Sequence, residues 1–221
     1  MDFISKVRRL PPAPPPNDNP ASIKGNLALE KKQLSVNILA WHIANFPDSR
    51  VFGHAELKDL RLVETHVWKN NMGENVELLE ETISPVDARQ HSLQGQTVCE
   101  VTVTEEMLNV HGTLAGGCSA HLIDIGTFSS LLTLSMVTGT DYTGVSTSLN
   151  ITYHAPAKPG AELRMVSTSI STSGRVVAAR AEVYDKRTSK LLVSAVHTIA
   201  PFQTAQTQNK PSRRDNSKAR L

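Results

Sequence analysis

One long apolar segment, at about residues 116–137, most constrains what this chain can fold into. Its length and the helix-like spacing of its apolar residues predict a helix that opens at a glycine pair and ends near Gly139. Alternating segments that predict strands lie on both sides of it, at 76–83, 97–104, 145–153, 161–172, 175–185 and 190–200. The last four are expected to form successive antiparallel strands. One apolar helix beside such strands buries its surface only if the sheet curls around it, so the sequence predicts an α+β fold with one long central helix.

A single carboxylate, Asp124, lies within this predicted helix, between Ile123 and Ile125. Burying a carboxylate among aliphatic side chains costs several kcal/mol unless it is paired or hydrogen-bonded. Two interpretations remain open from the residues alone: a catalytic carboxylate, or a buried carboxylate that only caps a backbone group. The glycines at the helix start offer free backbone N–H groups. Together, residues 109–124 suggest a site that stabilises a developing negative charge beside a carboxylate.

The strand predicted at 145–153 follows the helix and has two chemically different faces. Strict alternation places mainly apolar residues on one face, namely Val145, Thr147, Leu149, Ile151 and Tyr153. The other face then carries polar residues, namely Ser146, Ser148, Asn150 and Thr152.

Composition divides the chain into four parts. Residues 1–21 contain six prolines between positions 11 and 20 and are expected to form a disordered, extended leader. Residues 22–70 are expected to form a helical N-terminal extension, with a helix at 22–46 and a strand candidate near 60–68. Residues 71–202 hold the main domain, and residues 203–221 form a polar, basic tail that is expected to be disordered.

Charge and cysteine content exclude several classes of function. A formal net charge of +2 argues against nucleic acid as the main partner. We expect no membrane span, because no apolar run approaches the length needed to cross a bilayer. The N-terminus has no apolar signal-peptide core, so secretion is not expected. Cys99 and Cys118 do not make a disulfide framework, and the eight histidines show no tight ligand spacing, so no metal is expected.

Several motifs at compatible spacings resemble the PaaI-like hotdog-fold acyl-CoA thioesterases, close to the acyl-CoA thioesterase 13 group. The resemblance spans about residues 76–201 and covers nothing before about residue 70. The motifs that carry it are Asn109, Gly112-Thr113-Leu114, Gly116-Gly117, Asp124, Gly144-Val145-Ser146, Asn150-Ile151-Thr152-Tyr153 and Ala155-Pro156-Ala157-Lys158. It implies a hotdog fold, in which an antiparallel sheet curls around one central helix.

The resemblance also implies catalytic roles. Asp124 would be the catalytic carboxylate, as a general base on water or as a direct nucleophile. The backbone N–H of Gly116 would stabilise the thioester oxyanion, with help from the helix dipole. Asn109 would orient the carbonyl or the water, and Ser146 would help to hold the water or the carboxylate. The site would lie across the interface of a homodimer or homotetramer, with CoA as part of the substrate and no cofactor.

Binding of CoA is implied at Ser148, in the segment from Tyr153 to Lys158, and in the hairpin that holds Ser173, Gly174 and Arg175. Lys158 and Arg175 are the cations suited to phosphate groups. One position departs from the family pattern, because the usual His-Gly-Gly reads Ala-Gly-Gly here, with Ala115 in place of the histidine. A backbone oxyanion donor survives this change, whereas the contribution of the histidine side chain is lost.

That departure keeps a second function open, namely a catalytically weakened acyl-CoA-binding or scaffold protein. A third possibility is a hotdog hydratase or dehydratase, because such an enzyme needs a histidine–acid pair on the helix and His121 lies three residues before Asp124. The final tripeptide, Ala219-Arg220-Leu221, is similar to a C-terminal peroxisomal address. A peroxisomal or cytoplasmic location is expected, ahead of a mitochondrial one.

Overall fold

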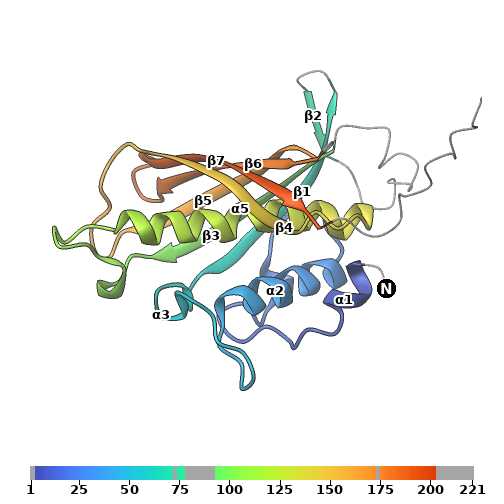
Figure 1. Ribbon diagram of the computed structural model, residues 1–221, viewed down its shortest axis with the longest axis horizontal. Helices are drawn as coiled ribbons and strands as arrows, with labels where there is room; N and C mark the ends of the chain where they lie inside the picture. Colours follow the sequence, from blue (N-terminus) through green and yellow to red (C-terminus); the bar gives the residue numbers. More distant parts are fainter. Residues whose placement is uncertain (1–2, 72–73, 78–92, 173–174, 203–221) are drawn as a thin grey trace, which may run out of the picture.

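The computed structural model of the protein describes residues 3–71, 74–77, 93–172 and 175–202. In these residues one antiparallel sheet of seven strands lies across the long helix α5, Gly116–Thr138 (Figure 1). The strand order is β2-β1-β3-β5-β6-β7-β4. The bounds are β1 Arg61–Asn71, β2 Glu74–Glu77, β3 Leu93–Thr102, β4 Gly144–Tyr153, β5 Glu162–Ser171, β6 Val177–Asp185 and β7 Leu191–Pro201. The predicted α+β fold with one long central helix is confirmed.

Small residues allow α5 to lie close to the sheet. A Cβ atom on Gly126 would lie 2.3 Å from the Cε atom of Met165, on β5. A Cβ atom on Gly95, in β3, would lie 2.4 Å from the backbone oxygen of Ser130. The buried hydroxyl group of Thr133 donates to the carbonyl oxygen of Ser129, one turn earlier in the helix. The helix therefore packs its polar side chains in the core without leaving them unsatisfied.

The order of strands in the sheet differs from the order in the chain. Strands β5, β6 and β7 form the expected meander, but β4 pairs with β7 at the sheet edge rather than with β5. The prediction of four successive antiparallel neighbours is therefore wrong for β4. Because β4 follows α5 directly, the chain crosses the helix to reach this edge, and the strand next to β3 is β5.

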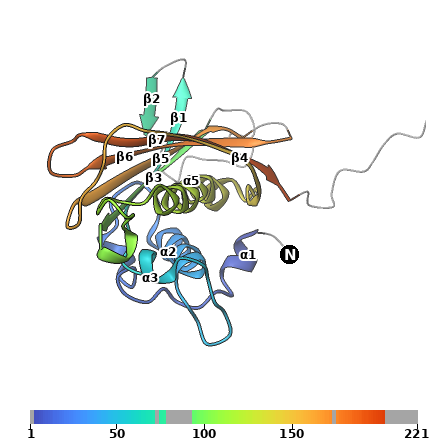
Figure 2. The ribbon, with the colours of Figure 1, turned by 60° about the vertical axis from the view of Figure 1, so that its left-hand side comes forward.

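Among the residues that the structure describes, three helices and their connections form a second layer, on the side of α5 away from the sheet (Figure 2). These helices are α1 Phe3–Val7, α2 Leu29–Ile43 and α3 His54–Leu57. The expectation of a disordered leader is wrong for the described part of residues 1–21. Phe3 and Val7 are buried against α2 and α5, and Asn17 donates to the backbone oxygen of Leu60. Apolar contacts thus hold a segment whose prolines alone favour an extended chain.

The helical extension is also shorter than expected. Strand β1, Arg61–Asn71, falls within residues 22–70 and pairs with β3 in the main sheet. The strand candidate near 60–68 is thereby confirmed, whereas the helix expected at 22–46 is confined to α2 after a short 3-10 turn at Pro20–Ser22. Most of the strand expected at 76–83 lies outside the described residues, as do the tail at 203–221 and the tripeptide at its end.

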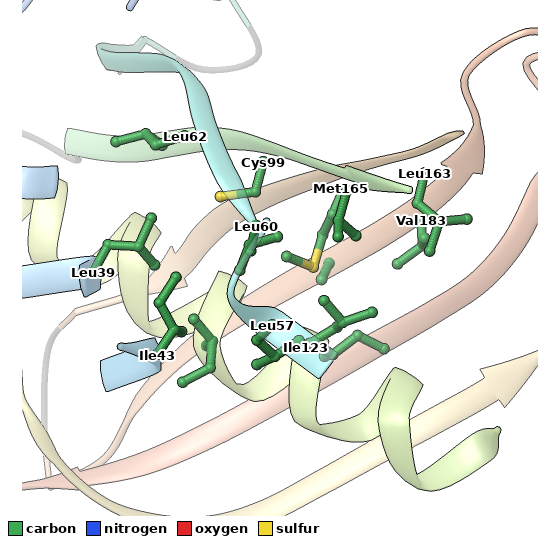
Figure 3. Packing of buried hydrophobic residues seen from close by; sticks show 14 of the residues in the cluster. Leu39, Ile43, Leu57, Leu60, Leu62, Cys99, Ile123, Leu163, Met165 and Val183 are labelled. Atoms are coloured by element: carbon green, nitrogen blue, oxygen red, sulfur yellow. The ribbon is translucent and has the colours of Figure 1, made fainter. Parts of the chain in front are cut away.

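The main core joins both layers through α5. Leu39 and Ile43 of α2 and Leu57 of α3 pack from one side, and Met165 and Val183 pack from the sheet (Figure 3). Since the two layers share one buried cluster, the N-terminal segment is part of the folded unit that holds the central helix in place.

By length and composition, α5 is apolar enough to cross a membrane, and it is the one such helix among the described residues. The expectation that no apolar segment reaches this length is therefore wrong. In the protein, 67% of its most apolar window is buried. A core helix between a sheet and a helical layer has the same length and apolar composition as a membrane span, so the finding is weak evidence for a membrane.

Candidate active site

Asp124 lies on the face of α5 that is turned toward β4. Its neighbours Ile123 and Ile125 are buried, whereas the Asp124 side chain keeps 36% of its surface exposed. The expectation of a carboxylate buried among aliphatic side chains is therefore corrected. Successive helix residues point about 100° apart, so the two isoleucines enter the core while the carboxylate reaches the rim.

Ser146 on β4 contacts this carboxylate, and its hydroxyl group donates to Oδ1 at 3.3 Å. A β-bulge at Thr147 makes the contact possible, because Ser146 pairs with Ile199 and Ser148 pairs with Thr198, leaving Thr147 as the extra residue. Ser146 thus shares the inner face of β4 with Leu149 and Ile151. Strict alternation had placed Ser146 on the opposite face, and the bulge corrects that prediction.

His197 on β7 is the third member of this cluster, and sequence reasoning did not single it out. Its ring is fully buried, and Nε2 lies 3.5 Å from Oδ1 of Asp124. Nδ1 lies 2.7 Å from the hydroxyl oxygen of Thr127. Burial lowers the pKa of His197, while the charge of Asp124 opposes the shift. A histidine among the apolar inward positions of β7, which are Val193, Ala195 and Ile199, was the signal available in the sequence.

Asn109 and Gly116 lie together at the start of α5. Both line a cavity of about 410 Å³ that Tyr153 also lines. The Asn109 side-chain oxygen accepts the backbone N–H of His111 at 2.9 Å and that of Thr113 at 3.3 Å. These bonds fix which end of the carboxamide is the oxygen. The other end is therefore the NH₂ group, which can act as a hydrogen-bond donor.

Gly116 is the first residue of α5, so its N–H group belongs to the helix donors that have no intrahelical acceptor. Tyr153 donates its hydroxyl hydrogen to the Gly116 carbonyl oxygen at 2.9 Å. A Cβ atom on this glycine would lie 3.2 Å from the Tyr153 hydroxyl oxygen. Ala115 is the N-cap and offers no side-chain cap, so no side chain of the N-cap residue occupies the N–H groups at the helix start.

The two groups of candidate residues do not meet within one chain. Gly116 and Asp124 are separated by eight residues along a continuous helix, which corresponds to about 12 Å. The cavity lined by Asn109 and Gly116 does not include Asp124 or Ser146 among its lining residues. One chain therefore presents an anion-stabilising half-site at the helix start and a carboxylate half-site two turns further on.

Neither cysteine among the described residues is a ready nucleophile. Burial raises the pKa of the Cys99 thiol to about 12 and that of the Cys118 thiol, on α5, to about 11. Both thiols therefore stay protonated near neutral pH. In the parts of the chain that the structure describes, no group of three His, Cys, Asp or Glu side chains is arranged to hold a metal ion.

Sequence comparison places this geometry in a family. The chain is 35% identical over 105 residues to the acyl-coenzyme A thioesterase 13 of Homo sapiens, which is 47% of this chain and 71% of that protein. The chain belongs to the thioesterase superfamily. The model of that superfamily matches residues 111–191. The acyl-coenzyme A thioesterase 13 of Mus musculus is 38% identical over 103 residues, which is 46% of this chain and 69% of that protein.

A solved structure, that of zebrafish thioesterase superfamily member 2, is 28% identical with a TM-score of 0.44, and the match covers 48% of this chain and 73% of that chain. The thioesterase-superfamily match at 111–191 contains Gly116, Asp124 and Ser146. His197 and the whole N-terminal layer lie outside it.

The positions that the thioesterase resemblance assigns to CoA are spread over the surface. Ser148, on the outer face of β4, accepts the side-chain N–H of Asn150 at 2.9 Å. Tyr153 faces the Gly116 cavity, and Lys158 and Arg175 are exposed cations in loops. Ser173 and Gly174 lie outside the described residues. Their roles in CoA binding stay predictions.

Proposed function

We propose that this protein hydrolyses the thioester of an acyl-CoA to a free carboxylic acid and CoA. The observation that carries the proposal is the pair of half-sites on α5: a carboxylate contacted by Ser146 and His197, and a helix start that presents the Gly116 N–H beside Asn109. Thioester hydrolysis needs a base or nucleophile and donors for the oxyanion. The human and mouse relatives are named acyl-coenzyme A thioesterases, which supports the substrate class.

In this mechanism Asp124 acts in one of two ways. As a general base, it takes a proton from water while the water oxygen bonds to the thioester carbonyl carbon. As a nucleophile, its carboxylate attacks that carbon, and water then hydrolyses the anhydride. In both cases the Gly116 N–H and the Asn109 NH₂ donate to the oxyanion, the carbon–sulfur bond breaks, and CoA leaves as a thiolate that takes up a proton. Ser146 holds the carboxylate or the water in line.

We further propose that the working site forms between two copies of the chain. The half-sites are about 12 Å apart on one straight helix, so a single carbonyl group cannot contact both in one copy. Among the described strands, β4 ends the sheet order, and its outer edge is suited to pairing with a second copy. In such a homodimer, alone or within a tetramer, Asp124 of one copy faces Asn109 and Gly116 of the other. Lys158 and Arg175 then serve as contacts for the CoA phosphates.

The test replaces the carboxylate by its isosteric amide. We expect Asp124→Asn to lower kcat for acyl-CoA hydrolysis by at least about 10²-fold, because the amide neither takes the proton nor attacks. Asp59→Asn, at an exposed aspartate outside the site, is the matched control and should keep wild-type activity. Circular dichroism checks that both variants are folded. Full activity of Asp124→Asn would contradict this mechanism.

Ala115 favours one second candidate function, an acyl-CoA-binding or scaffold protein with weakened catalysis. At this position the family's histidine side chain is replaced by a methyl group at the N-cap of α5. Steady-state turnover and calorimetric binding on the same panel of acyl-CoAs separate the two functions. Binding without turnover by the wild-type protein decides for the scaffold.

A further inference from the structure

A groove of about 600 Å³ lies between the N-terminal layer and the C-terminal half of α5. This volume is typical of sites for small molecules, which occupy about 300–1,000 Å³. Its walls are mainly apolar side chains, contributed by the N-terminal layer and by α5: Phe3, Val7, Leu10, Trp41, Phe128 and Leu132. Figure 1 shows α1 and α2 lying along this half of the helix. The groove therefore has one wall from the main domain and one from the N-terminal layer.

The groove begins close to the carboxylate half-site on two separate elements. On α5, Phe128 lines the groove one turn after Asp124, and its ring packs edge-on against His197 with centroids 5.5 Å apart. On β4, Gly144 lines the groove two residues before Ser146. One helix turn and two strand residues each span about 5–7 Å. A chain attached to a carbonyl group at Asp124 therefore enters the groove after its first few methylene groups.

The groove also extends well away from the carboxylate. Leu132 lies eight residues after Asp124, about 12 Å further along the helix. At that depth Phe3 and Val7 of α1 pack against Leu132. Among the described residues, the two charged side chains that line the groove are Lys6 and Asp141, and they pair with each other at 3.8 Å. What the groove offers a ligand is thus mostly apolar surface, which extends along α5 as far as Leu132.

We propose that this groove binds the aliphatic chain of the acyl-CoA and that the N-terminal layer, through residues 3–42, sets the chain length that the site prefers. The inference rests on the proposed function for its carbonyl position at Asp124. The wall that selects the chain lies outside the residues matched by the superfamily model, which begin at residue 111. Acyl-CoAs with medium and long unbranched chains are the substrate class that fits. As such a chain extends along α5, each added methylene group is buried in the groove.

The first test measures kcat/KM for butanoyl-CoA, octanoyl-CoA and palmitoyl-CoA. Burial of each added methylene group should raise kcat/KM about fourfold until the groove is full. Leu10→Trp fills the groove from its half-buried rim, so the ratio of kcat/KM for palmitoyl-CoA to that for butanoyl-CoA should fall by at least about tenfold. Leu29→Trp is the matched control, because Leu29 is 57% exposed on α2 and does not line the groove. An equal change for all three substrates in Leu10→Trp overturns the proposal.

The second test does not need turnover. Trp41 lines the groove, and Trp68 is the other tryptophan of the chain, so Trp68→Phe leaves Trp41 as the fluorescent reporter. Non-hydrolysable S-hexadecyl-CoA should bind at least about tenfold more tightly than S-butyl-CoA and change the Trp41 emission. Adding Leu10→Trp would confuse the signal, so Leu10→Phe is used here, and it should remove most of the difference. Equal affinities for the two thioethers contradict the groove.

The two tests separate this inference from the function on which it rests. Tight, chain-length-dependent binding of the thioethers without hydrolysis of any acyl-CoA supports the groove and rejects the hydrolase. Hydrolysis whose efficiency is independent of chain length in the wild type and in Leu10→Trp supports the hydrolase and rejects the groove.

Discussion

Asp124 lies between two side chains with different hydrogen-bonding roles, Ser146 and His197. Ser146 donates one neutral hydrogen bond from β4, whereas His197 lies fully buried beneath the carboxylate. The Thr127 hydroxyl group contacts the His197 Nδ1 atom at 2.7 Å and the Ile123 carbonyl oxygen at 2.7 Å. Since that hydroxyl group has one hydrogen, donation to the helix carbonyl makes Nδ1–H the donor of the other bond. Nε2 then faces Asp124 as an acceptor.

Burial of His197 makes the stability of the protein depend on pH. The pKa of the folded-state ring is below its ordinary value because burial disfavours the charged form. Above about pH 6.5, the unfolded and folded states both carry a neutral ring. Below that pH the unfolded chain binds the proton first, so the free energy of unfolding falls as the pH drops toward the folded-state pKa. The slope from one such group is at most about 1.4 kcal/mol per pH unit.

We therefore expect His197→Gln to flatten this slope between about pH 7 and pH 5 in urea unfolding experiments. Glutamine keeps a polar group near Thr127 and removes the titration. His111→Gln is the control, because His111 is exposed, and it should keep the wild-type slope. If His197→Gln loses stability on acidification as steeply as the wild type, the titrating group is elsewhere.

At the scale of elements, the contact between α5 and the sheet depends on glycine at one position of β3. A Cβ atom on Gly95 would lie 2.4 Å from the Ser130 backbone oxygen, which cannot rotate away as a side chain would. We expect Gly95→Ala to lower the free energy of unfolding by about 1–3 kcal/mol, because the helix must shift away from the strand. Gly117→Ala is the matched control, since a Cβ atom there would have no neighbour within 4 Å. Equal midpoints for the two variants in urea would contradict this account.

Elements with a strong period could be predicted from the sequence, and their arrangement could not. Helix α5 and strands β5, β6 and β7 lie within a few residues of their predicted bounds, because each has a clear apolar pattern. The edge position of β4 depends on the crossing over α5, and the packing of residues 3–17 depends on α2 and α5 as partners. Tertiary contacts decide the position of β4 and the packing of residues 3–17, and the local sequence pattern does not reveal such contacts.

The candidate site shows the same division. Residues near glycines and in motifs, such as Asn109, Gly116 and Asp124, could be named from the sequence. The β-bulge that turns Ser146 toward Asp124 leaves no strong local mark, since Thr147 has the composition of an ordinary strand residue. His197 is distant in sequence from Asp124, and packing of α5 against β7 is what places the two side chains together.

At the scale of the whole molecule, α5 separates the two kinds of chemistry that thioester hydrolysis needs. Its first residue presents an N–H group, and its ninth residue presents the carboxylate. A rigid helix cannot bring them to one carbonyl group, but two helices related by a twofold axis can, each giving its start to the other's carboxylate. This arrangement predicts that a substitution in one half-site of one subunit and a substitution in the other half-site of its partner leave one intact site in the mixed dimer.

We expect Asp124→Asn and Asn109→Ala to be nearly inactive alone and to recover activity when the two variants are unfolded together and refolded as a mixture. Half of randomly formed dimers are mixed, and each mixed dimer keeps one site with both Asp124 and Asn109, so about a quarter of the wild-type activity should return. Refolding each variant alone is the control for the procedure. A site completed within a single chain would give no recovery in the mixture, since every copy lacks one of the two residues. Size-exclusion chromatography of the mixture confirms that the species with recovered activity is an oligomer.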